Sequence, residues 1–221
     1  DQIGAAVAPT HRALCCLRAI TGNVDKPGAC VLAEAPDFVS ELAMEMSDAM
    51  PASCRAAALS SYRTPLQSYA GYDALRALTE RLGRTPPMRY LTSAHPDLVL
   101  RAMEEGRPYP IRALVVQATN PLLTYGDTAR VQRALAALDL LVVLEYRLTP
   151  TAQLADYVLP IAGALERPVL QVHGGIANAA YGGPAAVAPY YERRCDYDVF
   201  RELGRRLGQA EFWPEETLED A

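Results

Sequence analysis

The hydrophobic pattern of this chain changes near residue 106. Before that point the residues predict mainly helices, separated by turns and by a polar loop over residues 60–68. Glycines at positions 22, 83 and 106 are typical helix terminators. The predicted helices cover residues 9–20, 37–50 and 73–82, and a further one begins at Pro96 or Asp97 and ends at Gly106.

After residue 106 the pattern predicts a strand, a helix and a second strand. The strands cover Ala113–Gln117 and residues 140–144, and the amphipathic helix between them covers residues 127–138. In such a crossover unit the strands are parallel neighbours and the helix packs on one face of the sheet. Ligands bind at the carboxyl ends of such strands, here residues 119–124 and 145–151.

The rest of the chain completes an α/β fold class. Residues 167–194 are rich in Gly, Ala, Pro and Tyr and predict an extended loop, and residues 196–207 predict the last helix. Thr149 is expected to cap a helix whose first residue is Pro150, close enough to a strand end to touch phosphate.

Composition excludes several classes of protein. Half of the 221 residues are hydrophobic, which favours a packed core, and the net charge of −5 comes with no basic block, so no nucleic-acid partner is expected. No apolar run has the length of a membrane span, so no direct span is expected. The five cysteines include no Cys-x-x-Cys pair, and Cys15 and Cys16 are expected to be buried, inert thiols in an apolar helix.

Short blocks of sequence occur in the order of a known family over nearly the whole chain, as far as about Gly208. They are Thr21-Gly22-Asn23-Val24-Asp25, Pro27-Gly28, Tyr109-Pro110-Ile111, Asn120-Pro121-Leu122, Thr149-Pro150-Thr151-Ala152, Leu154-Ala155-Asp156, Val158-Leu159-Pro160, Leu165-Glu166-Arg167, Asp196-Tyr197-Asp198 and Arg205-Arg206-Leu207-Gly208. In this order they resemble the molybdopterin oxidoreductases of the dimethyl sulfoxide reductase and formate dehydrogenase type. The set is most similar to the thiosulfate or polysulfide reductase and acetylene hydratase branch.

The resemblance implies a Rossmann-like three-layer domain with a parallel sheet, part of a larger multidomain molybdopterin enzyme subunit. Residues 1–106 would be a mainly helical segment, residues 107–208 the α/β part that binds the pterin dinucleotide, and residues 209–221 a linker toward a C-terminal domain. Because the chain begins with Asp1-Gln2 and not with methionine, we expect an internal fragment. Any export signal would then lie upstream, and the sequence indicates no compartment.

The resemblance also implies the chemistry. The cofactor would be molybdopterin guanine dinucleotide with molybdenum or tungsten, used in two-electron redox chemistry on a small-molecule substrate such as a sulfur oxyanion. An iron-sulfur cluster and the metal ligand would lie in the N-terminal part upstream, and an iron-sulfur electron-transfer subunit is a possible partner. Asn120, Thr124 and Glu145 match family positions near the dinucleotide, and Thr149 joins them as a candidate only because it lies near a strand end. No catalytic or metal-binding residue is expected here.

Other readings stay open. An Asn-Pro turn often only ends a strand, and a strand-end Glu is often only solvated. Glu166-Arg167-Pro168 also departs from the formate dehydrogenase pattern, which places pterin contacts of that loop in doubt. The remaining function classes are an active oxidoreductase, a non-catalytic relative of the complex I large-subunit type, and an unrelated nucleotide-binding α/β domain. The chain contains neither Gly-x-Gly-x-x-Gly nor a P-loop motif, which argues against ordinary nucleotide binding.

Overall fold

The computed structural model describes residues 7–30, 51–59, 69–83, 94, 96–173 and 179–220. Contacts divide the chain into two units, one of residues 1–40 with 171–181 and one of residues 41–170 with 182–221. The predicted helix over residues 37–50 and the predicted loop over residues 60–68 lie outside the described residues. The domain boundaries expected near residues 106 and 208 stay predictions.

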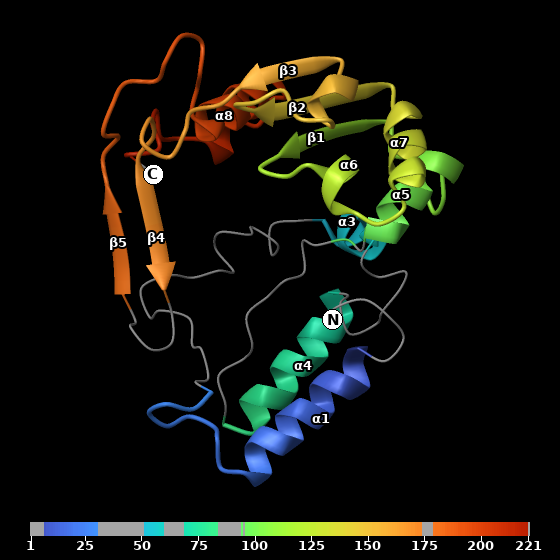
Figure 1. The fold of residues 1–221 in the computed structure, drawn as a ribbon, viewed down its shortest axis with the longest axis vertical. Helices are drawn as coiled ribbons and strands as arrows, with labels where there is room; N and C mark the ends of the chain where they lie inside the picture. The colour runs from blue at the N-terminus through green and yellow to red at the C-terminus, as the bar shows by residue number, and fades with distance from the viewer. Residues whose placement is uncertain are drawn as a thin grey trace. The chain divides into compact units, whose positions relative to one another are not determined.

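A parallel sheet organises the second unit. Its strands are β1 (Ala113–Gln117), β2 (Leu140–Glu145) and β3 (Tyr157–Pro160), in the order β1-β2-β3. Both pairings are parallel, with Ala113 opposite Leu140, and the three arrows point the same way in Figure 1. This confirms the predicted pairing of the first two strands.

Two helices cover one face of the sheet and form the core with it. They are α5 (Pro96–Glu105) and α7 (Thr128–Ala136). Val131 of α7 and Val143 of β2 are almost completely buried in the core between the helices and the sheet. Burial of such a side chain contributes about 1.5–3 kcal/mol to the free energy of unfolding. Asp127, where the predicted helix begins, caps α7, because its side chain accepts a hydrogen bond from the Arg130 backbone N–H at 3.1 Å.

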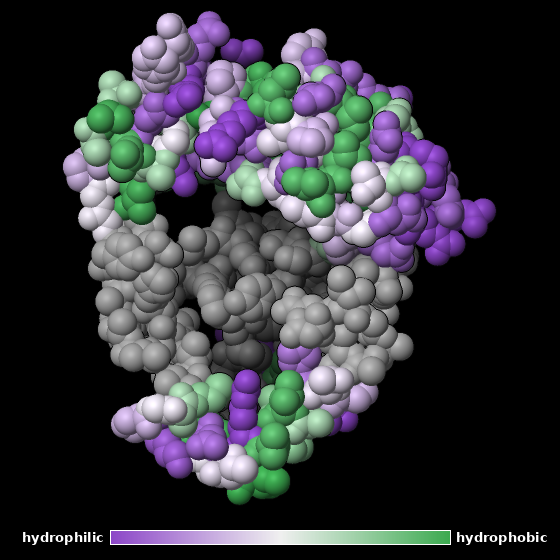
Figure 2. All heavy atoms as spheres, in the orientation of Figure 1, coloured by the Kyte–Doolittle hydropathy of each residue, from purple (hydrophilic) through white to green (hydrophobic). Residues whose placement is uncertain are grey.

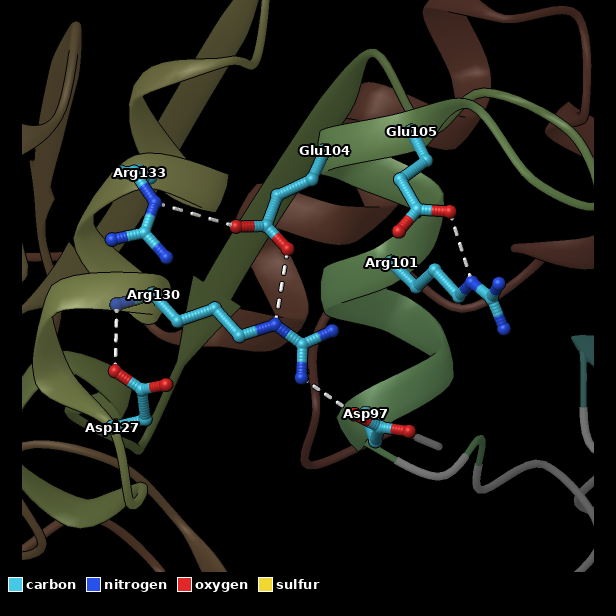
Figure 3. A network of polar contacts seen from close by, with 7 residues as sticks. All are labelled: Asp97, Arg101, Glu104, Glu105, Asp127, Arg130 and Arg133. Carbon is cyan, nitrogen blue, oxygen red and sulfur yellow. Dashed lines mark hydrogen bonds and ion pairs between the residues drawn. The ribbon is translucent and has the colours of Figure 1, made fainter.

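Ion pairs join α5 to α7 at the surface (Figure 3). The Arg130 guanidinium contacts Asp97 at 2.6 Å and Glu104 at 3.0 Å, and Arg133 lies 3.8 Å from Glu104. The hydrogen bonds to Asp97 and then to Glu104 raise the pKa of Arg130. The pairs hold the two helices of this layer together.

The third layer is α8 (Asp196–Arg206), which confirms the predicted last helix within one residue. It lies over the opposite face of the sheet, where a cavity of about 830 Å³ is lined by side chains of both. Within α8, Gly204 permits close packing, because a Cβ there would lie 2.4 Å from Nε1 of Trp213. Layers of helices on both faces of a parallel sheet establish the expected Rossmann-like α/β class.

The other described elements are short or helical. The predicted helices near residues 9–20 and 73–82 are confirmed as α1 (Val7–Ile20) and α4 (Tyr69–Arg81), and Gly83 ends the second at a φ of 64°. The remaining pieces are α3 (Ala52–Ala57), α6 (Pro121–Thr124), η3 (Ala152–Leu154) and η4 (Ala210–Phe212). In the described part of the chain, no helix is long and apolar enough to span a membrane.

The predicted extended loop over residues 167–194 is wrong in its first half. β4 (Val169–His173) and β5 (Ala179–Gly183) form a two-stranded sheet, and their arrows run in opposite directions in Figure 1. The prediction weighed the Gly, Ala and Pro content of the segment. It overlooked that Val169 and Val172 are β-branched residues, which favour a strand wherever a second strand supplies hydrogen-bond partners.

The predicted burial of Cys15 and Cys16 is also wrong. Both thiols are exposed, and so are their apolar neighbours Leu14 and Leu17. An apolar stretch of helix predicts burial only if another element covers it, and the sequence pattern of one helix does not contain that information.

Candidate cofactor-binding cleft

A cleft of about 520 Å³ opens at the carboxyl ends of the three parallel strands. Three of the four predicted site residues line it, namely Asn120, Thr124 and Glu145. Thr149 is not among the lining residues. Among the described residues, the lining consists of Gln117, Ala118, Thr119, Asn120, Thr124, Glu145, Tyr146, Ile161, Ala162, Gly163, Ala164, Arg167 and Asp196.

The loops that follow β1 and β2 are tied together by Asn120 and Thr151. Oδ1 of Asn120 accepts hydrogen bonds from Oγ1 of Thr151 at 2.5 Å and from its backbone N–H at 3.3 Å. Oγ1 of Thr151 in turn accepts the backbone N–H of Leu122 at 3.1 Å. Thr151 is fully buried, so its polar groups depend on these partners.

This tie fixes the orientation of the Asn120 amide. The backbone N–H of Thr151 is a donor only, so the Asn120 atom that faces it is the oxygen. Nδ2 is therefore the amide atom left over. Within the described residues it contacts no acceptor, although Asn120 lines the cleft.

Backbone donors lie next to this amide. Within the same described part, the N–H groups of Thr119 and Asn120 have no hydrogen-bond acceptor. Ala118 immediately before them has a φ of 55°, a left-handed conformation that costs a non-glycine residue about 1–2 kcal/mol. Local strain of this kind is found where the backbone must be aimed at a ligand.

The two predicted threonines make local contacts. Oγ1 of Thr124 donates to the Asn120 carbonyl at 3.0 Å and closes the turn of α6. Oγ1 of Thr149 accepts the Ala152 backbone N–H at 3.2 Å, as expected of a cap, but the helix it begins is only a turn followed by η3. Thr149 thus shapes the loop that presents Thr151.

Charged side chains face the cleft from two directions. Glu145 lies at the end of β2, and one of its oxygens accepts the Tyr146 backbone N–H at 2.9 Å. Opposite in charge, Arg167 follows β3 and lies 3.7 Å from Asp196 at the start of α8. Gln117 donates a hydrogen bond to that same Asp196 carboxylate. A cation and several N–H donors beside two carboxylates suit a ligand with both acidic and basic parts.

Each segment that follows a strand also exposes a leucine. Leu123, Leu148 and Leu165 are 72%, 69% and 67% exposed, respectively. On the face seen in Figure 2, hydrophobic residues reach the surface among hydrophilic ones over the unit that carries the sheet. Singly exposed leucines are common on protein surfaces, and none of the three lines the cleft.

Sequence reasoning missed four residues here, namely Gln117, Thr151, Arg167 and Asp196. Gln117 ends a predicted strand and Thr151 is a polar residue beside a predicted cap, so both stood near the expected edge of the sheet. Asp196 lies 79 positions after Gln117, and no local pattern announces that contact. Among the described residues, no group of three or more His, Cys, Asp or Glu is arranged to hold a metal ion.

Comparisons with known proteins identify relatives of this chain. A family model described as molybdopterin oxidoreductase matches residues 5–206. Acetylene hydratase of Syntrophotalea acetylenica is 33% identical over 205 residues, 92% of this chain and 28% of the relative. The solved structure of acetylene hydratase from Pelobacter acetylenicus superposes with a TM-score of 0.79 at 33% identity, over 93% of this chain and 29% of that one.

A more distant relative covers less. The molybdopterin-containing subunit of thiosulfate reductase from Salmonella typhimurium is 30% identical over 114 residues, 50% of this chain and 15% of the relative. The chain thus spans less than a third of the length of the relatives it matches.

Proposed function

This chain belongs to the molybdopterin oxidoreductase family, and we propose that its cleft binds the nucleotide end of a molybdopterin guanine dinucleotide. The observation that carries the proposal is the set of donors at the end of β1. Nδ2 of Asn120 and the N–H groups of Thr119 and Asn120 lie together without an acceptor among the described residues. Asn120 is half-buried, and half-buried donors are normally paired, so its donors, with the exposed Thr119 N–H beside them, fit the oxygens of a bound phosphate or sugar.

The other cleft residues fit further parts of the same group. The Glu145 carboxylate is suited to accept from ribose hydroxyls or a guanine amino group, and Thr124 closes the turn of α6. Arg167 places a positive charge where a pyrophosphate would carry a negative one. Thr149 would act one step away, by holding the loop that contains Thr151.

At the scale of the whole protein, we propose an enzyme that acts on a small-molecule substrate such as a sulfur oxyanion. When bound, the cofactor supplies two-electron chemistry at molybdenum or tungsten. The described residues would bind and orient its nucleotide end, while the metal ligand and an iron-sulfur cluster would lie in other parts of the protein. An iron-sulfur electron-transfer subunit is the partner we propose for this chemistry.

A second candidate is addition of water to a small unsaturated substrate. It is favoured by the 33% identity with acetylene hydratase over 92% of this chain. The cleft would have the same task in both cases, because the nucleotide end of the cofactor does not take part in the reaction. Assays with thiosulfate plus a reduced dye, and with acetylene and no electron donor, separate the two candidates.

Cofactor analysis of the full-length protein tests the proposal. We expect molybdenum or tungsten in the purified protein, together with pterin and guanine nucleotide in equal amounts, as a bis-pterin guanine dinucleotide centre requires. Protein that contains neither pterin nor guanine nucleotide would indicate a non-catalytic relative that keeps the fold. Pterin without guanine nucleotide would contradict the role assigned to this cleft.

A further inference from the structure

We propose that Glu166 is a positioning residue that holds one wall of the cleft in place, an inference that rests on the proposed function. Its carboxylate joins residues 161–167, which follow β3, to residues 190–196, which lead into α8. We call this set of contacts the Glu166 clip, made by Glu166 with Gly163, Tyr190 and Arg193. Glu166 does not itself line the cleft.

Three donor groups converge on the Glu166 carboxylate. Oε2 accepts the backbone N–H of Gly163 at 2.7 Å, and Oε1 accepts the backbone N–H of Tyr190 at 3.0 Å. Nη1 of Arg193 donates to both oxygens, at 3.0 and 3.1 Å. The Glu166 side chain is only 10% exposed, so water competes little for these contacts.

The contacts require the charged form of Glu166. The hydrogen bond from Gly163 is the main cause that lowers the pKa of Glu166 below its ordinary value, and Arg193 and the Tyr190 N–H add to it. A neutral amide at this position has one acceptor oxygen in place of two. It can satisfy the Gly163 N–H or the Tyr190 N–H, but not both together with Arg193.

Both segments joined by the clip supply the cleft wall. The cleft is lined by residues 161–164, which precede Glu166, and by Arg167, which follows it. Asp196, three residues after Arg193, also lines the cleft. The same segments pair beside the clip, where Ala162 N–H donates to the Arg194 carbonyl at 2.8 Å. The clip therefore sets the distance between Arg167 and Asp196, the charged pair that faces the ligand.

The test compares two variants of the full-length protein, Glu166→Gln and Glu104→Gln. Glu104 is a matched control because its carboxylate also pairs with arginine, here Arg130 and Arg133, and its side chain is 21% exposed. It lies in the α5–α7 ion pairs and not at the cleft. We expect Glu166→Gln to speed amide exchange in residues 161–167 and release of the cofactor by about tenfold each. Glu104→Gln should change neither, although both variants lower the melting temperature.

The pH profile of cofactor release separates positioning from general stability. Because folding lowers the pKa of Glu166, its contribution is present above the ordinary value of 4.5 and is lost as the pH falls through the lowered value. Arg193 is the charged side chain in contact with Glu166. Release from the parent protein should accelerate below pH 4.5, whereas Glu166→Gln should release rapidly at every pH and lack this step.

The outcomes are distinguishable. Unchanged exchange and unchanged release in Glu166→Gln would overturn the clip while leaving the proposed function standing. Equal acceleration in Glu104→Gln would also overturn it, because the effect would then be one of stability. If the parent protein holds no pterin nucleotide, the proposed function fails, and exchange in residues 161–167 still decides whether the clip holds that segment.

Discussion

The charged groups between α5 and α7 and the polar groups at the carboxyl edge of the sheet are arranged in opposite ways. Between the helices, Arg130 meets both Asp97 and Glu104 (Figure 3). At the edge of the sheet, donors of Thr119 and Asn120 remain without acceptors within the described residues. Paired groups contribute to fold stability, whereas donors held ready without a partner indicate a place for a ligand.

The polar groups of Thr151 are paired like those between the helices, although Thr151 is bound to Asn120, which lines the cleft. Replacing Thr151 with valine keeps the volume and the backbone N–H, but removes the hydroxyl that accepts the Leu122 N–H and donates to Asn120. We expect the free energy of unfolding to fall by about 1–3 kcal/mol, measured by urea titration. Thr124→Val, at an exposed position, should change it by less than about 0.5 kcal/mol. Equal effects of the two substitutions would remove the distinction between a buried tie and a surface contact.

Substitution of Asn120 tests the hydrogen-bond donors at the end of β1. Asn120→Asp keeps the oxygen that Thr151 needs but replaces Nδ2 with a second, negatively charged oxygen. Cofactor retention should fall by about tenfold or more, because a donor is lost and an anionic ligand is repelled. Asn120→Ala is less informative, since it also leaves the buried Thr151 N–H without its acceptor.

The control for this experiment is Asp127→Ala. Asp127 caps α7, so its loss should lower the free energy of unfolding by about 0.5–2 kcal/mol and leave cofactor content unchanged. Cofactor analysis of the two variants, purified in parallel, measures the difference. Full cofactor content in Asn120→Asp would remove the main reason for assigning this loop to the cofactor.

The smallest effect is expected among the ion pairs. Arg130→Gln should reduce the free energy of unfolding by about 1 kcal/mol or less, because these side chains are partly exposed to solvent. The difference from the parent protein should shrink at high salt, which screens exposed charges. A loss of cofactor in this variant would show that the helix layer and the cleft are not independent.

Local patterns were sufficient to predict the parts of the fold that depend on neighbouring residues. The apolar runs of β1 and β2 announce buried strands, Asp127 announces the start of α7, and Gly83 and Gly106 mark helix ends. The same logic failed for β4 and β5, where the partner strand decides, and for the exposed Cys15 and Cys16. In each failure the outcome depends on what another part of the chain supplies.

The cleft shows this limit more sharply. The edge of the sheet was predictable, because parallel strands place their carboxyl ends together. The contacts that shape it were not, since Asn120 meets Thr151 across 31 positions and Glu166 meets Arg193 across 27. Side-chain pairs at such separations leave no periodic signal in the sequence. The short sequence blocks shared with the family indicate which residues matter, but not which residues they contact.

The spacing of these contacts sets an order for how the site is built during translation. The Asn120–Thr151 tie can form once the ribosome has released the chain through Thr151, when the β1 and β2 loops are complete. The other wall waits for a further 42 residues, until Arg193 can reach Glu166. At elongation rates of roughly 5–20 residues per second, the nascent chain contains the Asn120–Thr151 tie for some seconds before the Glu166–Arg193 contact can form. A ligand recruited in that interval would meet the donors of Asn120 before it meets the charge of Arg167.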